Sequence, residues 1–203
     1  MNKIILQLFY MKILVTLFVL LFSYSVSADD ITDFEIEGIS IGDTLLKYMN
    51  EEEILVEKEE NKYFYASLGD PIFFEAYIFD GFKNFDYLSF FVKSNDTNYI
   101  IQAIYGVKYY ENNINDCYKK QKEISLELDN QFKNSIKNSN ELPLHWDQSG
   151  KSSMKRISYE LMNQDIIALE CYDWDESMQK GNPPNPDILS LSLNRKELFS
   201  WIN

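Results

Sequence analysis

The chain is poor in the residues on which most catalytic and metal sites depend. Its 203 residues include one histidine, His145, two cysteines, Cys117 and Cys171, and only seven glycines. One histidine and two cysteines do not supply the four ligands of a structural zinc site. A glycine-rich phosphate-binding loop is absent, and no serine lies in a Gly-x-Ser-x-Gly motif. The sequence therefore predicts no metal, no cofactor and no catalytic residue.

Long hydrophobic runs are scarce as well, and the clearest one lies near the N-terminus. Lys12 precedes apolar residues 13–22, and Val26-Ser27-Ala28 then places small residues at the −3 and −1 positions of a cleavage site. This order is typical of a secretory signal peptide. The run is too short to span a bilayer comfortably, and acidic residues follow it.

We therefore expect a signal peptide at residues 1–28 and a single domain at 29–203. Met11 heads a tidier signal than Met1, so either can be the true start. Too few residues remain after cleavage for two comfortable domains. The expected localisation is periplasmic or secreted.

Positive charge is also in short supply. The chain has 32 acidic and 19 basic residues, a net charge of −13, and removal of Lys3 and Lys12 with the signal leaves −15. Such a charge repels nucleic-acid phosphates and anionic lipid head groups. We therefore expect no nucleic-acid partner and no stable membrane insertion after signal cleavage. The acidic residues form a solvated surface or, alternatively, a site for a cation or a basic partner.

The two cysteines are predicted to form a disulfide, because an even count is typical of an exported protein. Cys117 falls on the apolar face of an amphipathic helix, and Cys171 shares a strand face with Ile167 and Leu169. Both side chains should then meet between helix and sheet, with Cα atoms within about 7 Å of each other.

Hydrophobic periodicity predicts an α+β domain. We expect an antiparallel sheet of about seven to eight strands, with a short N-terminal helix pair, one long helix and a C-terminal helix packed on it. Capping boxes at Asn50/Glu53 and Asn194/Glu197 mark two helix starts. The predicted strands are 34–41, 63–67, 72–79, 87–93, 99–110, 159–162, 166–172 and 188–193; the long helix is 113–137, and residues 138–155 are a long loop.

Several segments together resemble a group of uncharacterised secreted proteins from small-genome marine alphaproteobacteria. The resemblance implies export and a domain with paired cysteines, and it brings no activity, ligand or catalytic residue. The matching segments are residues 34–43, 98–101, 117–121 with 123–124, 171–174, and 196–197 with Trp201.

Two functional hypotheses follow. The first is an exported, non-catalytic binding or interaction module with a protein or glycan partner in the envelope. The 14 tyrosines and 14 phenylalanines mostly suit a core and cross-strand pairs, but an exposed aromatic patch could dock such a partner. The alternative is a small periplasmic hydrolase, in which His145 acts as a base with Asp147 or another carboxylate.

Overall fold

A seven-stranded antiparallel sheet forms the centre of the computed structural model, which describes residues 30–61, 71–111 and 113–202. The predicted signal peptide and the predicted strand at 63–67 lie outside the described residues. The strand order is β3-β4-β5-β9-β8-β7-β6. These strands are β3 (Phe73–Ile78), β4 (Tyr87–Lys93), β5 (Ile101–Tyr109), β6 (Ile136–Pro143), β7 (Ser153–Glu160), β8 (Ile166–Asp173) and β9 (Ile188–Asn194). The α+β class and the antiparallel sheet are confirmed.

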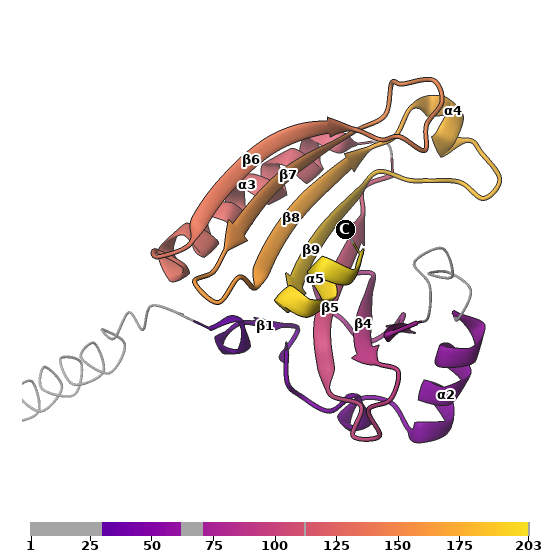
Figure 1. Ribbon diagram of the computed structural model, residues 1–203. Coiled ribbons are helices and arrows are strands. Elements are labelled where there is room, and N and C mark those ends of the chain that lie inside the picture. The colour runs from indigo at the N-terminus through magenta and orange to yellow at the C-terminus, as the bar shows by residue number, and fades with distance from the viewer. Residues whose placement is uncertain (1–29, 62–70, 112, 203) are drawn as a thin grey trace, which may run out of the picture.

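Helices flank both faces of this sheet. In Figure 1, α3 runs behind β6, β7 and β8, whereas α5 lies in front of β5 and β9. The helix α2 packs beside β3 at the opposite end of the sheet. The α-helices of the described residues are α2 (Glu51–Glu60), α3 (Ile114–Gln131), α4 (Glu176–Gln179) and α5 (Lys196–Ile202), with 3₁₀ turns η1 (Ile31–Asp33) and η2 (Leu45–Lys47).

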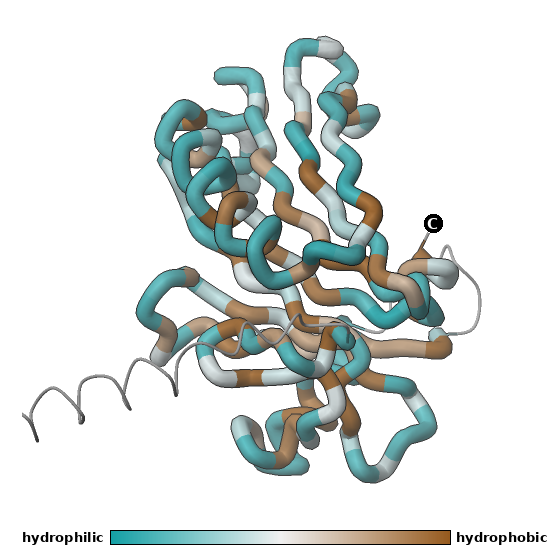
Figure 2. The backbone as a smooth tube through the Cα atoms, turned by 90° about the vertical axis from the view of Figure 1, so that its left-hand side faces the viewer, coloured by the Kyte–Doolittle hydropathy of each residue, from teal (hydrophilic) through white to brown (hydrophobic). Residues whose placement is uncertain are grey.

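Alternation of side chains along the strands gives the sheet two different faces. The face toward α3 carries the main hydrophobic core, in which Phe90, Ile104 and Leu169 are fully buried. The opposite face is covered at one end by α5, whose Leu198 packs on Phe91 in a second, smaller cluster. Figure 2 shows hydrophobic stretches along the strands and hydrophilic ones at many of the outer turns.

The predicted pairing of Cys117 with Cys171 is present in the structure. The two Cα atoms are 6.0 Å apart, inside the distance predicted from the sequence, and the disulfide joins α3 to β8. Both cysteines are fully buried in the main core. The disulfide therefore lies on the face of the sheet that α3 covers.

The N-terminal helix pair is only partly as predicted. The capping box at the start of α2 is present, since Asn50 accepts from the Glu53 amide at 3.0 Å and Glu53 accepts from the Asn50 amide at 2.8 Å. The first member of the pair is the 3₁₀ turn η2 rather than an α-helix. The predicted strand 34–41 is instead a hairpin of β1 (Glu35–Ile36) and β2 (Ile39–Ser40), because the chain turns at Gly38, where φ is +79°.

The prediction of a long loop at residues 138–155 was wrong. The chain forms the hairpin β6–β7 there, paired from Ile136↔Glu160 to Pro143↔Ser153. All eight residues of β6 are exposed. An edge strand without a buried face has no apolar alternation, so its sequence does not show the period of a strand. The long helix accordingly ends at Gln131 and not near residue 137.

The predicted capping box at Asn194/Glu197 was also wrong. Asn194 ends β9, and its side chain is committed to the sheet, accepting from the Tyr105 hydroxyl at 2.6 Å and donating to Ser192 Oγ at 2.9 Å. The start of α5 is bound instead by Asp165, whose carboxylate accepts from the Lys196 amide at 2.8 Å. A distant carboxylate thus replaces the local cap that the sequence suggested.

Gly106 in β5 provides a test of the packing on the core side. A Cβ atom at this position would lie 2.9 Å from ring carbons of Phe85, closer than real side chains approach. We expect Gly106→Ala to lower the free energy of unfolding by about 1–3 kcal/mol, because the ring must move. Urea denaturation measures the change. If the double variant Gly106→Ala/Phe85→Leu loses as much as the two single variants together, the two positions are not in contact.

Candidate functional site

The sheet face opposite α3 is hollowed to a volume of about 700 Å³. Small side chains form its floor: Ser89, Ser192 and Ala168 come from β4, β9 and β8. They lie in one row across the sheet with Tyr105, since Ser89 pairs with Tyr105, Tyr105 with Ser192, and Ser192 with Ala168. Each of the three is only 2% exposed, so the floor lies deep beneath the side chains that surround it.

Aromatic rings surround this floor on two sides. On one side, Tyr77, Phe79 and Tyr87 contact one another with ring centroids 5.5–6.1 Å apart. On the other side, Trp174 stacks with both Tyr172 (6.4 Å) and Trp146 (6.2 Å). These separations are those of interacting aromatic pairs.

Two aromatic rings at the rim remain largely exposed. Trp146 is 70% exposed and Phe79 is 62% exposed, although each is stacked on an inner ring. Exposed apolar side chains that adjoin other rings in one patch can mark a ligand-binding groove. The two rings therefore mark surfaces on which a ligand can stack.

A buried ion pair lies between the floor and one wall. Arg156 of β7 pairs in register with Glu170 of β8, and Arg156 Nε lies 3.4 Å from Glu170 Oε1. The Tyr172 hydroxyl donates to Glu170 Oε2 at 3.0 Å. Burial raises the pKa of Glu170 above its ordinary range, while the nearby Arg156 charge and the Tyr172 hydrogen bond oppose that rise.

Arg156 has hydrogen-bonding capacity to spare. Its Nε is buried and, despite its closeness to Glu170, makes no hydrogen bond of acceptable geometry. Within the described part of the chain, the guanidinium donates no hydrogen bond to the protein. Its charge also lies 5.6 Å from the centre of the Phe199 ring. The guanidinium is therefore held in position by Glu170 and Phe199, and its N–H groups can still donate hydrogen bonds to a ligand.

Carboxylates give the hollow a negative character. Glu75 of β3 is 7% exposed and, after burial itself, is the main reason that the pKa of the neighbouring Tyr77 hydroxyl is far above its usual range. Burial and then the charges of Glu170 and Glu75 also raise the pKa of Tyr105. All of these hydroxyls stay protonated at neutral pH and can donate hydrogen bonds.

His145 lines the hollow, but the partner predicted from the sequence is not available to it. Asp147 accepts hydrogen bonds from Ser149 (N and Oγ) and from Ser152 (N and Oγ), at 2.7–3.0 Å. These bonds hold the pKa of Asp147 well below its usual range. Asp147 therefore shapes the β6–β7 loop, and among the described residues His145 has no hydrogen-bonded carboxylate.

Sequence reasoning did not single out Arg156 or Glu170. One signal was present: Arg156 is one of only two arginines in the chain. Glu170 lies between Leu169 and Cys171, inside a strand that is otherwise largely apolar. A charged residue at the centre of a buried strand calls for a partner, and the register of β7 with β8 supplies it.

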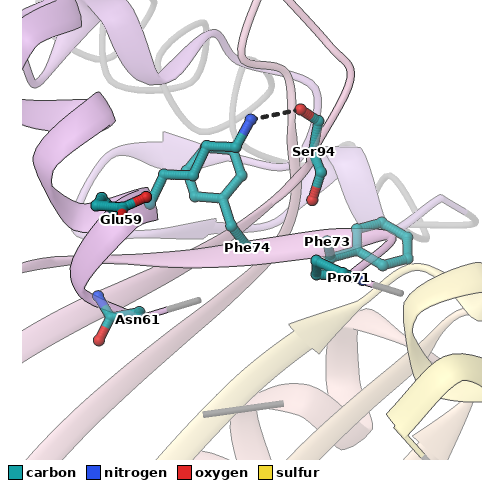
Figure 3. Close-up of a pocket in the computed structure, with 7 residues that line it drawn as sticks. Glu59, Asn61, Pro71, Phe73, Phe74 and Ser94 are labelled. Atoms are coloured by element: carbon teal, nitrogen blue, oxygen red, sulfur yellow. Dashed lines mark hydrogen bonds between the residues drawn. The ribbon is translucent and has the colours of Figure 1, made fainter. Parts of the chain in front are cut away.

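A smaller pocket of about 190 Å³ lies between the end of α2 and β3. The ammonium group of Lys58 donates to the Ser94 carbonyl at 2.6 Å and lies over the Phe74 ring. Figure 3 shows Phe74 and Ser94 among the lining residues of this pocket. Asn61 and Pro71, which flank the undescribed residues 62–70, form part of its lining. We assign no function to this pocket.

The described residues contain no group of three or more His, Cys, Asp or Glu side chains arranged to hold a metal ion. None of their helices is both long and apolar enough to cross a bilayer. No known protein family, curated protein or solved structure matches this chain.

Proposed function

We propose that this protein is an exported, non-catalytic binding module, periplasmic or secreted, that holds its ligand in the hollow on the open face of the sheet. The observation that carries the proposal is the hollow itself: a floor of small residues, walls of tyrosine and tryptophan, and a few buried charged groups. Ligand sites in proteins typically combine an apolar, concave lining with a small number of placed polar groups, at volumes of about 300–1,000 Å³. The signal-like residues 1–28, the paired cysteines and the resemblance to secreted proteins support export.

The arrangement of the carboxylates favours binding over catalysis. Glu75 and Glu170 lie on β3 and β8, which are four strand spacings apart, or about 19 Å along the sheet. Glycoside hydrolysis needs two carboxyl groups about 5–10 Å apart. Asp147, the nearest acid in sequence to His145, is already bonded to two serines.

A small hydrolase remains the second candidate, and one observation favours it. His145 lines the same hollow as the buried carboxyl group of Glu170. A hydrolase of this kind would convert its ligand, whereas a binding module returns the ligand unchanged. If the protein is a hydrolase, replacement of His145 by alanine would abolish conversion of the ligand. If it is a binding module, the variant would still bind its ligand saturably.

The direct test is to fill the hollow. Ala168 lies between Ser192 and Ser158 in the sheet and lines the hollow, so a larger side chain at this position would project into it. We expect Ala168→Phe to reduce the binding of compounds from the small-molecule fraction of an envelope extract by at least about ten-fold, since the side chain occupies the ligand's place. Native mass spectrometry of the folded domain, followed by release and identification of the bound compound, measures this.

Ser139→Phe is the matched control. Ser139 is exposed in β6 and pairs with Ile157, so its side chain lies on the face opposite the hollow. The control should bind like the original protein. Equal binding by Ala168→Phe and Ser139→Phe would contradict the proposal, and release of a chemically altered compound would favour the hydrolase.

A further inference from the structure

We propose that the occupant of the hollow is an uncharged segment of a glycan, held by stacking on the rim aromatics and by hydrogen bonds to the Arg156–Glu170 pair. This inference rests on the proposed function and names the chemical class of its ligand. Three features of the hollow carry it: its extent, its donor and acceptor groups, among which Arg156 Nε makes no hydrogen bond, and its exposed rings.

The hollow suits an extended ligand rather than a compact one. Its lining includes residues from β3, at one edge of the sheet, and from β6, at the other. Six strand spacings separate these edges, or roughly 29 Å along the sheet. A chain of several sugar rings has this length.

The polar groups of the hollow offer both donors and acceptors. Arg156 supplies guanidinium N–H groups that no described residue accepts, and Glu170 supplies carboxylate oxygens beside them. Adjacent hydroxyls of a sugar are at once donors and acceptors, so one pair of hydroxyls can bind both members of the ion pair. A purely apolar ligand would shut out solvent and leave Arg156 Nε without an acceptor, which costs free energy.

Charge argues against the other ligand classes. An anion would meet two buried carboxylates, Glu75 and Glu170, and a net charge of −13 on the whole chain. An organic cation would be attracted by these carboxylates but would meet the repulsion of the Arg156 guanidinium, which lies beside Glu170. A neutral ligand with many hydroxyls meets neither repulsion.

The exposed rings supply the remaining contact. Trp146 lines the hollow and stacks on Trp174, and Phe79 stacks on Tyr77, which lines the hollow from β3. The apolar C–H face of a sugar ring packs against an aromatic face. A rigid, preorganised ring loses little conformational freedom on binding, which favours this role.

The test titrates the intact mature protein with three uncharged oligosaccharides: chitohexaose, maltohexaose and laminarihexaose. Choline, glutarate and an uncharged polar hexapeptide represent the competing classes. We expect saturable binding of at least one oligosaccharide, seen as a change in tryptophan fluorescence and by calorimetry. Trp146→Ala should weaken that binding roughly three- to ten-fold. Leu126→Ala, 57% exposed on α3 on the far side of the sheet, is the control and should leave it unchanged.

The double variant Arg156→Gln/Glu170→Gln should weaken binding by at least about ten-fold, because the paired hydroxyls lose their charged partners. Removing both charges together avoids leaving one buried ion alone. Binding of the peptide, choline or glutarate in the hollow, with none of the three oligosaccharides bound, would overturn the glycan assignment and leave the proposed function standing. Oligosaccharide binding that Ala168→Phe and Trp146→Ala do not affect would place the sugar elsewhere and overturn it as well.

Discussion

Replacing Cys117 and Cys171 together by alanine is expected to lower the free energy of unfolding by about 4 kcal/mol. The disulfide closes a loop of 54 residues, and the entropy that this closure removes from the unfolded chain corresponds to about that value. The bond also holds α3 against β8, which is the strand that carries Glu170 on its other face. Urea or thermal unfolding of the domain measures the loss.

Reduction provides the internal control for this prediction. The original protein in reductant should approach the stability of the double variant, whereas the variant should not respond to reductant. Mass spectrometry of unreduced protein from an oxidising compartment should show the two cysteine-containing peptides linked. Free thiols in such a sample, or equal stability of the reduced and oxidised protein, would show that the bond is not a stabilising element.

The helix face and the strand face that meet at the disulfide could be predicted from the sequence because each has a strong local period. In α3, Cys117, Gln121 and Leu128 recur at helical spacing and are all buried. In β8, Ile167, Leu169 and Cys171 alternate with residues of the other face. When one face of a helix or strand packs against the core, apolar residues recur with the period of that element, so the sequence shows which face is buried.

The hollow could not be predicted in the same way, because it depends on register between strands that are far apart in sequence. Nothing in the sequence around Ser89 or Ser192 indicates that they share a site. They lie in one row only because β4 and β9 both pair with β5. The hairpin β6–β7 was missed for the related reason that β6 is an exposed edge strand. His145 lines the hollow, but its predicted pairing with Asp147 is absent, because the hydrogen bonds of Asp147 with Ser149 and Ser152 follow from the folding of the loop and not from any motif.

The ion pair in the hollow leads to the second large prediction. Arg156→Met is expected to lower the free energy of unfolding at neutral pH by about 3 kcal/mol, because it leaves the charge of Glu170 buried without its partner. Methionine keeps much of the volume of the side chain, so the loss of charge dominates. Lys151→Met removes the same charge from a side chain that is 71% exposed and should change stability little.

The pH dependence separates this electrostatic cost from a packing defect. Burial already raises the pKa of Glu170 above its ordinary value of 4.5, and the loss of Arg156 removes a charge that opposes that rise. The folded variant therefore binds a proton more readily than the unfolded chain does. Its stability is fully present below the unfolded-state pKa and is lost as the pH rises through the higher folded-state pKa.

Unfolding of Arg156→Met should consequently be closest to that of the original protein near pH 4 and furthest from it near pH 7. Adding Glu170→Gln to the variant should remove most of this pH-dependent difference, since no buried carboxyl group remains to titrate at the site. A deficit of the same size at both pH values would mean that Arg156 stabilises the protein through packing on Phe199 and not through Glu170. In that case the charge of Glu170 would not depend on Arg156 for its stability. The two residues would then not act as a pair, and the proposal that together they bind the hydroxyl groups of a sugar would lose its structural basis.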